Sequence, residues 1–125
     1  TTGVPGLIKA GMVRPKQVIL ALSNPDPEID PDEALAAGAS FAADGKAVNN
    51  ALAFPGLFKG ALRAHATHIN DAMKIAAAKT IAENAVEGEL TPNILDRTVH
   101  DLVAEAVRAA ALKTGVVKFS RHLEV

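Results

Sequence analysis

The first hydrophobic pattern in the chain predicts a buried strand. Residues 17–23 read Gln-Val-Ile-Leu-Ala-Leu-Ser, a short run rich in strand-forming residues, and the next four, Asn-Pro-Asp-Pro, stop it with turn-forming residues. The run is continuous rather than alternating, which favours a parallel sheet covered on both faces. Before this strand, residues 7–13 are predicted to form a short helix.

A helix and a second strand are predicted next. Residues 30–33, Asp-Pro-Asp-Glu, combine a capping side chain, a proline for the first helical position and acids for the first turn. Gly38 is predicted to end this helix, because glycine accepts the left-handed backbone of a cap. Residues 39–43 then form a short strand that turns at Asp44-Gly45. Strand, helix and strand in this order are typical of a βαβ unit.

From Leu52 onward the pattern is helical. Phe54, Phe58 and Leu62 stand four residues apart, so they share one face of a helix whose start is marked by Pro55. The pattern therefore predicts an α/β fold with a parallel sheet and a mostly helical carboxy-terminal half.

Two more helices are predicted in that half. Thr67 is predicted to cap the first, with Asp71 in its opening turn and its end near Glu87-Gly88. The second has the clearest helical spacing in the chain and Gly115 as its stop. Its periodic apolar residues are Val99, Leu102, Val103, Ala106, Val107 and Ala110.

Composition narrows the classes of function. The 125 residues suffice for one domain, and 13 basic against 14 acidic residues give a net charge of −1 without a basic stripe for nucleic acid. The chain has no cysteine, which excludes thiolate zinc sites and cysteine nucleophiles. No apolar run reaches the roughly 20 residues of a membrane-spanning helix. We expect a cytoplasmic protein that binds neither nucleic acid nor membrane. Since the first residue is not methionine, we also expect the sequence to be an excerpt of a longer chain.

Two asparagine sites follow the predicted strands. Asn24 comes directly after the first strand, and Asn49 and Asn50 come after the second. Ligands of open parallel sheets bind beyond the carboxyl ends of the strands, and an amide can pair with a carboxamide, a ribose hydroxyl or a carboxylate. Asparagine is equally ordinary as a turn residue or a helix cap. Spacing alone leaves both interpretations open.

Other polar residues form no recognisable catalytic or metal-binding pattern. The acidic residues of 26–33 fit a solvated loop that begins a helix. There is no G-x-G-x-x-G or P-loop sequence for phosphate, and no Ser-His-Asp arrangement at strand ends. The histidines lack the three or four convergent groups of a metal site; they are His65, His68, His100 and His122. We predict no catalytic residue and no metal ligand in this chain.

Several segments resemble malic enzymes in order and spacing. The longest are residues 21–29 (ALSNPDPEI), 48–62 (VNNALAFPGLFKGAL) and 71–78 (DAMKIAAA). The likeness covers about residues 4–115. It implies part of a Rossmann-like parallel sheet flanked by helices, with residues 1–125 forming the carboxy-terminal portion of an NAD(P)-binding domain.

The resemblance also implies an activity and roles for residues. The reaction is oxidative decarboxylation of malate to pyruvate and carbon dioxide, with reduction of NAD or NADP and a divalent metal, Mg²⁺ or Mn²⁺. Asn24 and Asn49 match cofactor contacts of the family, and Asn50 matches a contact nearer the substrate. The family's acid and base, a tyrosine and a lysine, and its metal-binding acids lie upstream, and this chain has no tyrosine. We expect the fragment alone to be inactive and the whole enzyme to be a homo-oligomer, a dimer or higher.

One departure from the family pattern follows the second strand. Family members usually carry a segment resembling G-R-S-D-Y-P-N-Q there, whereas Gly45 is followed only by Lys46-Ala47-Val48 before the asparagine pair. Either the loop is shortened or residues are missing from the sequence. The residue that would distinguish NAD from NADP also lies upstream.

An alternative of a different class is a non-catalytic helical oligomerisation or interaction module. In this interpretation the helices of residues 52–62 and 99–110 form a subunit interface. An exposed sheet edge would add to self-association.

Overall fold

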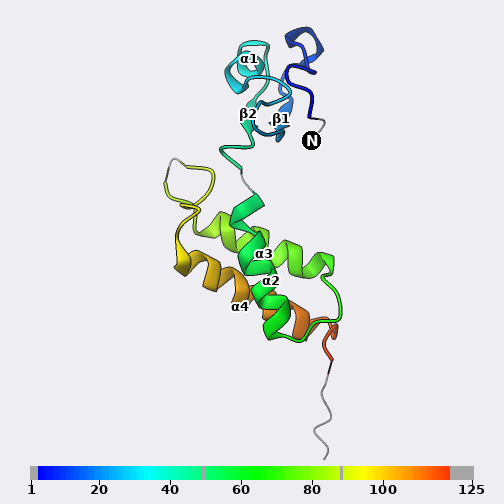
Figure 1. Ribbon diagram of the computed structural model, residues 1–125. Coiled ribbons are helices and arrows are strands. Elements are labelled where there is room, and N and C mark those ends of the chain that lie inside the picture. Colours follow the sequence, from blue (N-terminus) through cyan, green and yellow to red (C-terminus); the bar gives the residue numbers. More distant parts are fainter. Residues whose placement is uncertain (1–2, 49, 88, 119–125) are drawn as a thin grey trace, which may run out of the picture. The chain divides into compact units, whose positions relative to one another are not determined.

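The chain divides into two compact units. The computed structural model describes residues 3–48, 50–87 and 89–118, and the division falls between Asn49 and Asn50. The first unit contains a 3-10 helix (Ala10–Met12), β1 (Val18–Ala21), α1 (Pro31–Ala36) and β2 (Phe41–Asp44). The second contains a 3-10 helix (Asn50–Leu52), α2 (Phe54–Arg63), α3 (Asp71–Glu83) and α4 (Arg97–Lys113), as Figure 1 shows. The predicted α/β class with a mostly helical second half is confirmed.

The first unit is the predicted βαβ arrangement. β1 and β2 pair in parallel, from Val18 opposite Phe41 to Ala21 opposite Asp44, and α1 connects them and contacts both. The Asp30 side chain caps α1 by accepting hydrogen bonds from two backbone N–H groups of the first turn. Local capping chemistry therefore starts this helix where the sequence predicts.

The sheet of the first unit is covered on one face by the described residues. Ile19 and Ala21 are buried, and they pack with Ile29 of the following loop and with α1. Val18 and Leu20, on the opposite face of β1, are 61% and 52% exposed. Within this unit the described residues cover one face of the sheet, and the face that carries Val18 and Leu20 stays exposed.

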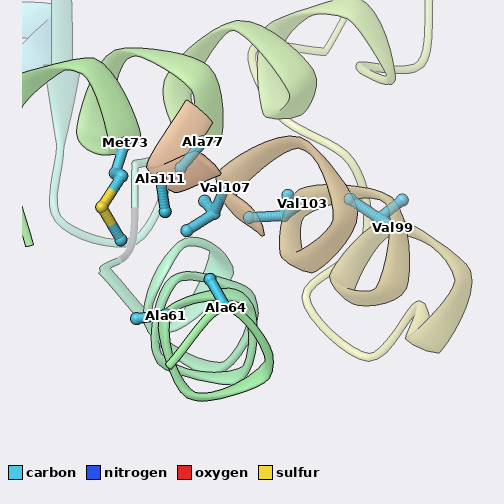
Figure 2. Close-up of a cluster of buried hydrophobic side chains, with 8 residues drawn as sticks. All are labelled: Ala61, Ala64, Met73, Ala77, Val99, Val103, Val107 and Ala111. Carbon is cyan, nitrogen blue, oxygen red and sulfur yellow. The ribbon is translucent and has the colours of Figure 1, made fainter. Parts of the chain in front are cut away.

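The second unit is a three-helix arrangement in which α2 and α3 both pack against α4. Figure 2 shows the side chains of its core gathered in the space between these helices. They are all alanine, valine or methionine and almost fully buried: Ala61, Ala64, Met73, Ala77, Val99, Val103, Val107 and Ala111. On α4 the predicted periodicity holds for the three valines, whereas Leu102 is 46% exposed. Small side chains let the helices approach closely.

α2 and α4 approach each other closely at two glycines of α2. A Cβ atom added to Gly56 would lie 2.5 Å from Cγ1 of Val103, and one added to Gly60 would overlap the carbonyl oxygen of Ala104. Side chains at these positions would force the helices apart. The predicted common face of Phe54, Phe58 and Leu62 is exposed, by 61%, 44% and 74%.

Three predicted helix boundaries are wrong. The N-cap of α3 is Asn70, whose side chain accepts a hydrogen bond from the Met73 N–H at 3.0 Å, and not Thr67, whose hydroxyl donates to the carbonyl of Val116. α3 ends at Glu83 because the next residue, an asparagine, caps it with backbone and side-chain hydrogen bonds. The predicted amino-terminal helix of residues 7–13 shrinks to one 3-10 turn.

Candidate functional site

The carboxyl ends of the two strands meet at one edge of the sheet. Ala21, the last residue of β1, is paired with Asp44, the last residue of β2. Asn24 follows β1 at this edge, is exposed, and is joined to Pro25 by a cis peptide bond. The structure therefore places Asn24 where ligands of parallel sheets bind, as the sequence predicts.

Gly45 is the neighbour that shapes the surroundings of Asn24. This buried glycine directly follows β2, and a Cβ atom built on it would lie 2.8 Å from Nδ2, 2.9 Å from Oδ1 and 3.1 Å from Cγ of Asn24. The amide of Asn24 thus lies against the bare backbone of Gly45. The sequence predicts a turn at Gly45, but it does not predict the contact of Gly45 with Asn24.

The turn that carries Gly45 is held by Asp44. One carboxylate oxygen of Asp44 accepts hydrogen bonds from the N–H groups of Lys46 at 2.9 Å and Ala47 at 3.0 Å. The Asp44 carbonyl also accepts from the Val48 N–H at 3.1 Å. The connection after β2 is therefore a closed turn in which the aspartate side chain is engaged with the backbone.

The loop that carries Asn24 is held by a buried carboxylate. Glu28 is 6% exposed, and it accepts hydrogen bonds from the hydroxyl of Ser23 at 2.6 Å and from the Ser23 N–H at 3.2 Å. The hydroxyl oxygen of Ser23 accepts in turn from the Gly3 N–H. The prediction that Glu28 belongs to a solvated acidic loop is wrong; the buried neighbour Ile29 is the signal in the sequence that the chain turns inward there.

The structure describes less of the asparagine pair than of Asn24. Asn49 lies outside the described residues, and Asn50 begins the 3-10 helix of the second unit. The N-cap of α2 is Ala53, which makes no side-chain hydrogen bond.

The described residues do not fit a metal ion. None of their His, Asp and Glu side chains form a group of three that could coordinate one. His100, for example, pairs through Nε2 with the carbonyl of Ile94 at 2.8 Å. In the described part of the chain, no helix has both the length and the apolar character needed to cross a membrane.

The edge near Asn24 suits an uncharged polar group. An exposed amide offers two N–H donors and one carbonyl acceptor. The adjacent Gly45 has no side chain, which leaves the room that this amide occupies. A carboxamide or a ribose hydroxyl matches this arrangement, and both occur in nicotinamide nucleotides.

Comparison with known proteins gives a consistent result. Residues 6–113 match the family described as malic enzyme, NAD binding domain. The chain is 60% identical over 112 residues to NAD-dependent malic enzyme 1 of Bacillus subtilis (strain 168), covering 90% of this chain and 26% of that protein. It is 47% identical over 113 residues to the bifunctional malic/malolactic enzyme of the same organism, covering 82% and 28%.

Solved structures agree. The malic enzyme from Pyrococcus horikoshii Ot3 superposes with a TM-score of 0.81 at 39% identity, over 96% of this chain and 30% of that one. The malic enzyme of Entamoeba histolytica also gives a TM-score of 0.81, at 33% identity, over 97% and 28%. The chain thus spans between a quarter and a third of the length of these relatives.

The 60% identical relative also bears on the short turn after Gly45. Its alignment has 112 positions, and 90% of the 125 residues of this chain is about 112 residues, so the chain has no gap in it. A stretch of that length must include residues 45–48. This relative therefore has no residues inserted into the connection after Gly45, which favours a shortened loop over residues missing from the sequence. Family match, sequence identity and superposition together show that the chain belongs to the malic enzyme family and corresponds to part of its NAD-binding domain.

Proposed function

We propose that this chain positions the nicotinamide nucleotide and malate in an enzyme that converts malate to pyruvate and carbon dioxide while reducing NAD or NADP. The observation that carries the proposal is the exposed amide of Asn24, set against Gly45 at the carboxyl edge of a parallel sheet. The names of the relatives, which include NAD- and NADP-dependent malic enzymes, support the choice of reaction.

The three asparagines have two proposed roles. Asn24 and Asn49 contact the nicotinamide side of the cofactor, and Asn50 contacts malate. A neutral amide suits these contacts because it can donate to a carboxylate or carbonyl and accept from a hydroxyl without repelling either. When bound, the nucleotide supplies the hydride acceptor for the malate carbon that carries the hydroxyl.

The proton-transfer and metal-binding groups are proposed to lie elsewhere in the whole protein. The chain has no tyrosine, and its described residues provide no metal-binding group. We assign the divalent metal, Mg²⁺ or Mn²⁺, and the acid and base to that remainder. The proposed role of this chain is to bind and orient the nucleotide and malate. Alone, the chain is expected to be inactive.

Substitution of Asn50 tests the proposal. In the whole protein, Asn50→Ala should cost about 1–3 kcal/mol in kcat/KM for malate, because a buried group of the substrate is left unpaired. Asn93→Ala, in the exposed loop before α4, serves as the matched control and should leave kcat/KM unchanged. Unchanged malate kinetics in Asn50→Ala would rule out the substrate contact.

A second candidate function is a non-catalytic oligomerisation or interaction module. It is favoured by the exposed stripe of Phe54, Phe58 and Leu62 on α2, where the two phenylalanine rings are 4.6 Å apart. The buried valines of α4, in contrast, are used inside the second unit. Light scattering with NAD titration separates the candidates, since a stable oligomer that binds no nucleotide would favour the module.

A further inference from the structure

Gly45 and Asn24 come from different strands and meet at the candidate site. They are 21 positions apart in the sequence, yet an added Cβ on Gly45 would approach three atoms of the Asn24 amide to between 2.8 and 3.1 Å. Real Cβ atoms essentially never come within 3.0 Å of a heavy atom outside their own and the adjacent residues. The present position of the amide therefore depends on position 45 having no side chain.

Both sides of this contact are held by hydrogen bonds. On one side, Asp44 holds the turn through the N–H groups of the three residues that follow Gly45. On the other side, the buried carboxylate of Glu28 holds both the N–H and the hydroxyl of Ser23, the residue before Asn24. With Ser23 and the turn held in this way, a side chain at position 45 would limit the rotation of the Asn24 side chain.

The backbone of Gly45 does not itself require glycine. The glycines with left-handed φ angles are Gly3, Gly6, Gly38 and Gly115 among the described residues, and Gly45 is not one of them. An alanine at position 45 would therefore fit the backbone. Its methyl group would displace the exposed, rotatable amide of Asn24 rather than the sheet.

We propose that Gly45 is a positioning residue for nucleotide binding: by lacking a side chain, it lets the Asn24 amide take the orientation that meets the nicotinamide nucleotide. This inference rests on the proposed cofactor contact of Asn24. It predicts that alanine at position 45 weakens nucleotide binding without unfolding the protein.

The test is a double-mutant cycle in the whole protein. NAD and NADP are titrated against the unmodified protein, and the tighter of the two is the probe for Gly45→Ala, Asn24→Ala and the double variant. Gly11→Ala is the matched control, because Gly11 is exposed, has no left-handed φ angle, and an added Cβ meets nothing within 4 Å. Gly45→Ala should raise the Kd roughly 3- to 20-fold, the size expected when one neutral hydrogen-bonding group is misplaced.

The double variant distinguishes positioning from other causes. Asn24→Ala removes the amide atoms that the new methyl group would meet, so the double variant should bind no more weakly than Asn24→Ala alone. Two outcomes would overturn the inference. In the first, the losses of affinity of the two single variants multiply in the double variant. In the second, Gly45→Ala binds nucleotide like the unmodified protein while Asn24→Ala binds it weakly. If Asn24→Ala itself binds normally, the cofactor contact of Asn24 is wrong, and the inference falls with it.

A measurement without ligand checks the geometry directly. In the nucleotide-free protein, the side-chain NH₂ resonances of Asn24 should shift in Gly45→Ala and stay in place in Gly11→Ala. The thermal unfolding midpoints of these two variants should agree. Unshifted Asn24 resonances in Gly45→Ala would contradict the contact on which the inference depends.

Discussion

The two units of the chain differ in what they bury. Among the described residues, the buried polar side chains are Ser23 and Glu28, and both belong to the strand-containing unit. The core of the helical unit consists of alanine, valine and methionine. Burying a carboxylate is unfavourable unless it is hydrogen-bonded, so a buried carboxylate marks a place where hydrogen bonds hold the structure. The difference indicates that the first unit fixes the shape of a loop, whereas the second is stabilised by packing.

Truncating the core of the helical unit should give the largest change in stability. Met73 is fully buried between α3 and α4, and Met73→Ala should lower the free energy of unfolding by about 2–5 kcal/mol through lost burial and the cavity left behind. Ile75→Ala, two residues away and 54% exposed, is the control. Urea unfolding of the chain gives both values, and equal losses would show that packing at Met73 is not what stabilises this unit.

Removing the buried carboxylate tests the other side of the comparison. Glu28→Ala leaves the N–H and hydroxyl of Ser23 without their acceptor and should lower the free energy of unfolding by about 1–3 kcal/mol. Asp26→Ala, in the exposed part of the same loop, should have little effect. If both variants unfold at the same urea concentration, the polar group is not needed to hold the loop.

The cap of α3 should have a smaller effect. Asn70→Ala removes the acceptor for the Met73 N–H and should cost about 1 kcal/mol. Asn70→Asp keeps that acceptor and should retain most of the stability, although it loses the hydrogen bond that the Asn70 amide donates to Thr114. An aspartate variant as unstable as the alanine variant would mean that the bond to Thr114, and not capping, is what matters.

The ion pair between α2 and α4 should have the smallest effect and a defined pH dependence. The hydrogen bond and charge of Lys59, followed by the charge of Arg63, hold the pKa of Asp101 below its ordinary value of 3.8. A lowered folded-state pKa contributes stability above the unfolded-state pKa, and this contribution is lost as the pH falls through the folded-state value.

The measurement is the difference in unfolding midpoint between the unmodified chain and Asp101→Asn. It should be present at neutral pH, disappear as the pH drops below 3.8, and shrink in high salt because both partners are exposed. In a Lys59→Ala background most of the difference should be absent at every pH. A difference that grows on acidification would contradict the assigned sign.

Much of the fold was predictable because its signals are local. The cap and proline at residues 30–33 start α1, and the left-handed Gly38 and Gly115 follow the ends of α1 and α4. The predicted cap at Thr67 is wrong because the Thr67 hydroxyl donates to the carbonyl of Val116, 49 positions away, a contact that local spacing does not show. Sequence patterns thus predict elements better than they predict which of two nearby polar side chains caps them.

The candidate site was predictable only where its signals are local in the sequence. Asn24 follows a strand and could be placed at the sheet edge from the sequence. Its dependence on Gly45 arises from the pairing of two strands, and the burial of Glu28 arises from the inward turn of the loop. The spacing of residues along the chain shows neither, although the apolar Ile29 is a signal of the inward turn.

The close contact of α2 with α4 has a consequence for variation. At Gly56 and Gly60 even one methyl group would meet Val103, Val107 or a backbone carbonyl. Every residue that a single nucleotide change can put in place of glycine is therefore too large for the space. The neighbouring core alanines leave room for at least one small alternative, glycine. In a library that samples all substitutions, α2 should therefore show two positions, one helical turn apart, that accept no residue except glycine. That spacing would mark the face of α2 that contacts another helix, without a structure.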